Sequence, residues 1–158
     1  MHVHSCDIYL VEIHQTAPLA PYRSHLRSSS TTTKAIVRLT TDNGITGWGE
    51  HNQNFLDGID IDQQNLEASE FINGWDPYAL ELFHQQNPFD TRLRCGLEMA
   101  MWDIIGKANN LPLYKMLGGK VRERIALAAC MGIQSYDKAG EMARWYVEQG
   151  FTTLKTKA

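Results

Sequence analysis

Two lysines near the end of the sequence, Lys155 and Lys157, are spaced for joint chemistry. They lie in a segment typical of a β-strand, and side chains two residues apart in a strand point to the same side. Two ammonium groups held this close repel each other, which favours loss of a proton from one of them. A neutral lysine amine can act as a general base. The spacing equally fits a pair of solvated lysines, so it leaves both interpretations open.

The residues before the lysines predict the elements that must position them. Residues 125–131 are apolar on both faces, as in a strand covered on both sides, and residues 151–157 predict a second strand. Between them, Ser135 is in place to cap a helix that Gly150 closes. A strand, a helix and a strand in this length predict a βαβ unit with parallel strands. Both lysines then lie at the carboxyl end of the second strand, where α/β folds bind ligands.

The first third of the sequence favours β structure. Residues 3–13, 34–41 and 45–50 are rich in strand-forming types, and Asn43-Gly44 predicts a tight hairpin with two positive-φ positions. We therefore expect a three-stranded antiparallel sheet. Residues 16–33 contain two prolines and a run of hydroxyl side chains, which predicts a mobile loop that is ordered only when a ligand closes it.

Helices are predicted after the sheet. Residues 60–73 and 77–86 predict two weaker helices, and Asn87-Pro88 has the cap-then-proline order of a helix start, with Asp90 in the first turn. This third helix is the strongest in the sequence and ends near Asn110. Its apolar side chains recur at helical spacing and define one buried stripe: Leu93, Leu97, Met101, Ile104 and Ala108.

Composition excludes several classes of protein. The 158 residues are 43% hydrophobic and carry a net charge of −3, which suits a globular chain and leaves no basic surface for nucleic acid. No apolar stretch approaches the roughly 20 residues that a membrane span needs, and no signal sequence begins the chain, so we expect a cytoplasmic protein. The three cysteines are widely spaced, which predicts reduced, buried thiols rather than disulfides or a zinc site.

Four blocks of sequence, in order, resemble one enzyme family. They are 42–50 (DNGITGWGE), 97–107 (LEMAMWDIIGK), 111–119 (LPLYKMLGG) and 149–157 (QGFTTLKTK). Together they closely resemble the mandelate racemase and muconate lactonizing group of the enolase superfamily. The resemblance implies that residues 1–120 form an α+β capping domain, with a three-stranded antiparallel sheet followed by helices. It implies that residues 121–158 form the first βαβ unit of a truncated, TIM-like (β/α) barrel.

The resemblance also implies a reaction. Members of this group abstract the proton next to a substrate carboxylate, and a bound Mg²⁺ ion holds the resulting enediolate. Lys157 matches the family's general base, and Lys155 matches the partner that keeps its neighbour deprotonated and helps to bind the carboxylate. A divalent charge at the developing oxyanion is what brings so weak a carbon acid within reach of a lysine.

The family's metal ligands stand on barrel strands beyond residue 158, so we expect no metal ligand in this chain, which is expected to be inactive by itself. The complete enzyme is expected to use Mg²⁺, to act on a small carboxylic acid such as an acid sugar, and to form a homo-oligomer. We expect neither nucleic acid nor a membrane as a partner.

Two loops of the capping domain select the substrate in this family. By position, the resemblance makes six residues candidates for substrate contact: Tyr22, Arg23, His25, His51, Asn52 and Asn54. Arg23 is suited to pair with a distal carboxylate, and the polar set suits a hydroxylated acid.

Several functions remain open at this point. The first is the N-terminal portion of a magnesium-dependent sugar-acid dehydratase. A racemase, epimerase or cycloisomerase of the same superfamily is the alternative within this class of lyases and isomerases. A stand-alone binding module and a non-functional remnant, whether a fragment or a natural truncated product, are the alternatives outside it.

Overall fold

The computed structural model describes residues 1–52 and 60–157. The chain divides into two compact units, one of Met1–Glu12 with Thr33–Lys120 and one of Ile13–Thr32 with Val121–Ala158. Residues 13–32, which were expected in the capping domain, therefore group with the C-terminal residues. No helix in the described part of the chain has the length and apolar character that crossing a bilayer requires.

A three-stranded sheet forms one layer of the first unit. Its strand order is β1 (Val3–His14), β4 (Thr31–Thr41) and β5 (Thr46–Asn52). β4 and β5 are antiparallel. β1 is antiparallel to β4, as two hydrogen bonds show: the amide of His2 donates to Asp42, and the guanidinium of Arg38 donates to Asp7. The predicted three-stranded antiparallel sheet is confirmed.

The turn between β4 and β5 differs from the predicted one. Gly44 has a φ of +84°, whereas Asn43 is not among the positive-φ residues of the described chain. The amide N–H of Gly44 donates to the carbonyl of Thr41 at 2.9 Å. The Thr41 hydroxyl then accepts from the amide of Ile45 at 2.9 Å. This side-chain bond supports a turn in which only the glycine needs the left-handed region.

Four helices follow in the described part of the first unit: α1 (Ile61–Ile72), α2 (Leu80–Gln86), α3 (Thr91–Ala108) and α4 (Leu113–Met116). The predicted start of the third helix is wrong by a few residues. Asp90 is the N-cap itself, because its carboxylate accepts from the amides of Arg92 and Leu93, both at 3.0 Å. Asn87 instead ends α2, and its side chain accepts from the amide of Phe89 at 2.8 Å.

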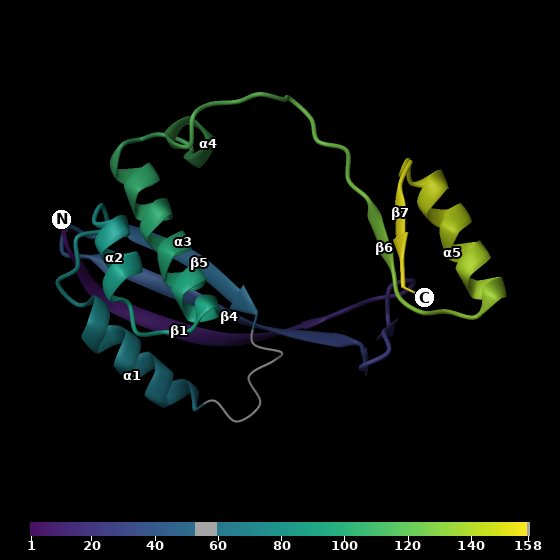
Figure 1. The fold of residues 1–158 in the computed structure, drawn as a ribbon, viewed down its shortest axis with the longest axis horizontal. Helices are drawn as coiled ribbons and strands as arrows, with labels where there is room; N and C mark the ends of the chain where they lie inside the picture. The colour runs from purple at the N-terminus through teal and green to yellow at the C-terminus, as the bar shows by residue number, and fades with distance from the viewer. Residues whose placement is uncertain (53–59, 158) are drawn as a thin grey trace. The chain divides into compact units, whose positions relative to one another are not determined.

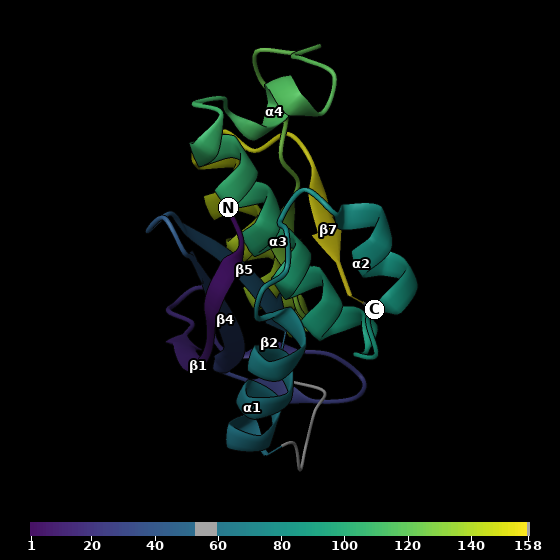
Figure 2. The same cartoon turned by 90° about the vertical axis from the view of Figure 1, so that its left-hand side faces the viewer.

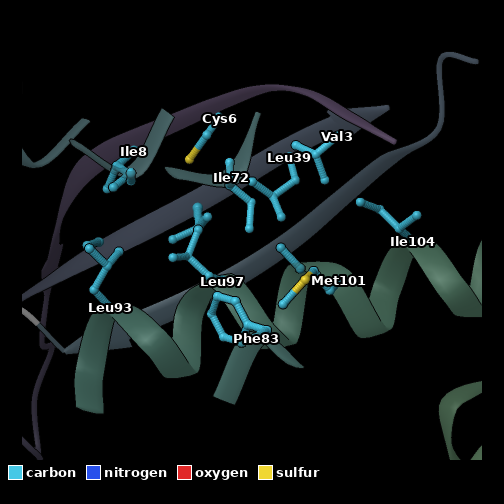
Figure 3. Packing of buried hydrophobic residues seen from close by; sticks show 14 residues of the cluster. Val3, Cys6, Ile8, Leu39, Ile72, Phe83, Leu93, Leu97, Met101 and Ile104 are labelled. Atoms are coloured by element: carbon cyan, nitrogen blue, oxygen red, sulfur yellow. The ribbon is translucent and has the colours of Figure 1, made fainter. Parts of the chain in front are cut away.

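The core of the first unit lies between the sheet and α1, α2 and α3. Figure 2 shows β1 and β4 on the left of this unit, α3 running through the middle beside β5, α2 on the right and α1 below. Figure 3 shows Leu93, Leu97, Met101 and Ile104 of α3 pointing toward the strands, where Val3, Ile8 and Leu39 meet them. The predicted stripe thus packs against the sheet at Leu93, Leu97, Met101 and Ile104. Ala108 was predicted to belong to it but is exposed, because it is the last residue of α3 and lies past the end of the packed face. Phe83 and Ile72 are also fully buried.

Two glycines of the DNGITGWGE block bring β5 against α3. A Cβ on Gly47 would overlap the carbonyl oxygen of Ala100, and a Cβ on Gly49 would overlap that of Gly96. Asp103 on α3 accepts the amide N–H of Trp48 at 2.9 Å and so ties the strand to the helix. The residues of this block therefore have a structural role, because they hold β5 close to α3.

The second unit is built on a βαβ arrangement. β6 (Ala129–Met131) and β7 (Leu154–Thr156) pair in parallel, and α5 (Tyr136–Glu148) lies alongside them (Figure 1). Gly150 has a φ of +91° and ends the helix, as predicted. Met142 and Tyr146 of α5 pack on one face of the strand pair with Ala129, Met131 and Leu154.

Both strands of the second unit are shorter than predicted. Ile125 and Leu127 are 75% and 70% exposed, and β6 begins only at Ala129. An apolar segment forms a strand only where a neighbouring strand supplies backbone hydrogen-bond partners. β7 pairs with only the last three residues of this segment.

Residues 16–33 have more structure than the predicted loop. They contain a short antiparallel pair, β2 (Tyr22–Arg23) with β3 (Ser28–Ser29), and Thr31–Thr33 already belong to β4. The amide of Ile133 donates to the carbonyl of Arg23 at 2.9 Å, which attaches the loop to the end of β6. Dependence of this order on a ligand stays a prediction.

Candidate functional site

Lys155 stands on the face of the strand pair that α5 does not cover. In the register of β6 and β7, Ala129 pairs with Leu154 and Cys130 pairs with Lys155. Ala129 and Leu154 pack toward α5, so the next residue on each strand points to the opposite face. Lys155 and Cys130 are accordingly both exposed.

Lys157 extends the same face by one step. It lies just past β7, but its amide N–H still donates to the carbonyl of Met131 at 3.2 Å. The parallel ladder thus reaches Lys157, and strand alternation places its side chain on the side of Lys155. Both lysines lie at the carboxyl end of the parallel pair and are exposed.

Tyr22 is the predicted substrate residue that the structure brings to this face. Its phenolic oxygen lies 3.7 Å from the Sγ atom of Cys130, and Cys130 is the register partner of Lys155. The bond to Cys130, together with partial burial, raises the pKa of the Tyr22 phenol. Tyr22 therefore stays protonated at neutral pH. Either atom can donate in its contact with Cys130, and when the Cys130 thiol donates, the Tyr22 hydroxyl is free to donate elsewhere.

Gly132 makes the approach of the loop possible. A Cβ on Gly132 would lie 2.7 Å from the backbone nitrogen and 2.8 Å from the carbonyl oxygen of Arg23. Sequence reasoning missed this residue. The available signal was a glycine directly after an apolar strand segment, which marks a close backbone approach. Cys130, which links Tyr22 to the lysine strand, was also missed, because nothing in its residue type distinguishes it within the predicted strand.

The other loop candidates lie elsewhere. Arg23 follows Tyr22 in β2 and so points to the opposite side. His25 is exposed in the turn between β2 and β3.

His51 and Asn52 lie at the end of β5 in the first unit. His51 is only 5% exposed and packs against Gly96 of α3, whose Cβ would lie 3.1 Å from the His51 ring. Among the described residues, neither ring nitrogen of His51 has a hydrogen-bond partner. Burial lowers the pKa of His51, so the ring is neutral at pH 7. Asn54 lies outside the described residues.

The described residues do not supply a metal centre. No group of three or more His, Cys, Asp or Glu side chains in residues 1–52 and 60–157 is arranged to hold a metal ion. What the second unit offers is a pair of lysines, a thiol and a phenol at the carboxyl end of a parallel strand pair. Such a set can accept a proton and bind an anionic substrate group.

Comparison with known proteins adds a family. Residues 7–118 match the family model described as the mandelate racemase / muconate lactonizing enzyme N-terminal domain. The chain is 29% identical over 131 residues to D-galactonate dehydratase from Pectobacterium atrosepticum, an alignment that covers 76% of this chain and 34% of that protein. It is 28% identical over 147 residues to L-Ala-D/L-Glu epimerase from Bacillus subtilis, covering 87% of this chain and 40% of that protein.

A solved structure has the same fold. The dipeptide epimerase from Enterococcus faecalis V583, complexed with Mg and the dipeptide L-Leu-L-Tyr, superposes with a TM-score of 0.84 at 25% identity. The match covers 100% of this chain and 46% of that one. The chain thus spans about a third to two fifths of the length of the two curated relatives.

Proposed function

Because this chain belongs to the mandelate racemase / muconate lactonizing enzyme family, we propose that it is the N-terminal portion of an enzyme that removes the proton next to a substrate carboxylate. The supporting observation is the register of β6 with β7. It aligns Lys155 with Cys130 on the face away from α5, where Tyr22 contacts Cys130. A base, a cation and a neutral donor then share one surface.

Each of these side chains has a role in the proposal. The neutral amine of Lys157 accepts the proton from the α-carbon at its Nζ atom. The ammonium group of Lys155 pairs with the substrate carboxylate. The Tyr22 hydroxyl donates a hydrogen bond to a substrate oxygen and so orients the acid. Arg23 points away from this face, so within the proposal it does not contact the reacting end of the substrate.

Magnesium belongs to the proposal for the complete enzyme. Such an ion would stabilise the negative charge that develops on the carboxylate when the proton leaves. The described residues do not fit a magnesium site, and the two lysines repel a dication. We therefore assign no metal ligand to this chain and derive no step through the metal.

The proposed substrate class is a hydroxylated acid, so that the enzyme is a sugar-acid dehydratase. Similarity to a D-galactonate dehydratase and the polar side chains of the loop support this class. In a dehydratase reaction, the substrate loses the hydroxyl on the neighbouring carbon as water after its α-proton has been removed. Similarity to L-Ala-D/L-Glu epimerase and dipeptide epimerase supports a second candidate, an epimerase that returns the proton on the other face.

Proton exchange tests the step that both candidates share. A polypeptide that continues from residue 158 through the remaining barrel strands is incubated in D₂O with Mg²⁺ and a panel of acid sugars and dipeptides. Loss of the α-proton signal in the NMR spectrum reports proton abstraction, and the product then separates a dehydratase from an epimerase. Lys157→Ala is expected to lower the exchange rate by about 10²- to 10⁴-fold, whereas Lys115→Ala in α4 leaves it unchanged.

Two outcomes would oppose the proposal. Exchange within tenfold of the parent in Lys157→Ala would remove Lys157 from the role of base. Magnesium-dependent exchange by the 158-residue chain alone would mean that the chain holds a metal site of its own.

A further inference from the structure

A cavity of about 510 Å³ lies between the loop and α5 in the second unit. Met142 lines it and belongs to the apolar cluster on the α5 face of the strand pair. Lys155 and Lys157 stand on the other face, and neither lines the cavity. The volume falls within the roughly 300–1,000 Å³ of small-molecule sites in proteins. The cavity is therefore large enough for a ligand of its own, apart from the lysine face.

One part of the cavity wall is apolar and stiff. Pro18 and Pro21 come from the loop, and Met142 and Trp145 come from α5. Proline rings restrict the loop backbone, and an indole offers a flat surface on which a ring can stack. Trp145 is 38% exposed, so one part of its ring remains accessible. These walls suit a flat apolar ligand more than a hydroxylated one.

Three charged side chains also line the cavity: Arg23, Lys138 and Glu141. Lys138 and Glu141 are three residues apart on α5, on neighbouring positions of one helix face. The structure records no ion pair and no side-chain hydrogen bond for these three residues among those it describes. The lining therefore has one uncompensated positive charge.

We propose that this cavity binds a small organic monoanion with a flat apolar ring, such as an aromatic carboxylate. The anionic group lies between Arg23 and Lys138, and the ring stacks on Trp145 between the two prolines. The guanidinium of Arg23 is suited to a carboxylate because its paired N–H groups match the two oxygens. Glu141 disfavours a second negative charge on the ligand. The site does not depend on proton abstraction at the lysine face.

Isothermal titration calorimetry of the 158-residue chain with 2-naphthoate tests the proposal. The matched probe is 2-naphthalenemethanol, which keeps the ring and lacks the charge. We expect one saturable site for naphthoate, affinity for the alcohol about threefold or more weaker, and loss of the difference at high salt. Arg23→Gln and Lys138→Gln should each weaken naphthoate binding about threefold, whereas Glu141→Gln should strengthen it.

The controls separate charge from folding. Lys115→Gln makes the same charge change in the first unit and should leave binding unaltered, and circular dichroism verifies each variant. Trp145→Leu keeps an apolar side chain but removes the stacking surface, so it should weaken both probes. The proposal is overturned if naphthoate does not saturate, if the alcohol binds equally well, or if Glu141→Gln weakens binding as much as Lys138→Gln does.

Discussion

The carbonyl oxygen of Gly96 on α3 lies against Gly49 on β5 so closely that a Cβ on Gly49 would overlap it. Backbone therefore meets backbone at this point. The contact sets the distance between the sheet and the helix that carries the buried stripe.

Gly49→Ala should lower the free energy of unfolding by about 3 kcal/mol, because the methyl group can be accommodated only by moving α3 away from the sheet. Urea denaturation followed by circular dichroism measures the loss. Glu50→Ala is the matched control on the next residue, where an exposed pair with Lys34 is removed at a cost of about 0.5 kcal/mol or less. Equal stability of the two variants would contradict the close contact.

Gly132→Ala should loosen the attachment of the loop to β6. The added methyl group would meet the backbone of Arg23 and strain the bond from the Ile133 amide to the Arg23 carbonyl. Hydrogen exchange of that amide should accelerate about tenfold or more. Gly140→Ala, in an open position of α5, should leave the exchange unchanged and stabilise the helix by up to about 1 kcal/mol. An unchanged rate in Gly132→Ala would mean that the loop does not depend on this approach.

The free energy of unfolding should decrease on mild acidification because of His51. Burial lowers its folded pKa below the unfolded value of 6.5. As the pH drops below 6.5, the unfolded chain takes up a proton that the folded chain resists, so the free energy of unfolding decreases. His51→Gln should remove this part of the dependence between pH 7 and pH 5, whereas His4→Gln at an exposed position should not. Identical pH profiles for the parent and His51→Gln would refute the assignment.

The three cysteines should differ in reactivity. The sequence predicted buried thiols, but only Cys6 is buried, whereas Cys95 and Cys130 are exposed. Burial, with a smaller effect of Asp7, raises the pKa of Cys6 to about 12. A thiol reagent at pH 8 should therefore titrate two thiols in the folded chain and three in urea. The Cys6→Ser variant should give two reactive thiols both in the folded state and in urea. If three thiols of the folded parent react rapidly with the reagent, Cys6 is accessible.

The sequence predicted those parts of the fold that depend on residues close together in the chain. The strand-forming residue types of the first third and the apolar spacing on α3 are local patterns, and they indicated the sheet and the longest helix correctly. The turn at Gly44 differed because the Thr41 hydroxyl bonds across it, and the start of α3 differed because Asp90 takes both capping amides. Side-chain bonds of this kind compete with backbone propensity and are not visible in periodicity.

The candidate site was predictable only in part. The two-residue spacing of Lys155 and Lys157 gave their common face, because strand alternation is a local property. The contact of Tyr22 with Cys130 joins residues more than a hundred positions apart and depends on Gly132 accepting the loop backbone. No local pattern carries such information. The opposite orientations of Tyr22 and Arg23 follow from alternation in β2, but the sequence predicted a loop there, so this alternation was not expected.

The division of the chain into two interleaved units orders their assembly during synthesis. The first unit has all its residues once Lys120 has left the ribosome, whereas Ile13–Thr32 must wait for residues 121–158 before their own unit can close. Domains generally fold as their residues become available, and closing a long loop carries an entropic cost. A nascent chain therefore holds residues 13–32 anchored by β1 and β4 at both ends while β7 is still being translated. The lysine face therefore forms after the first unit has all its residues, and the loop that carries Tyr22 is already tethered when it does.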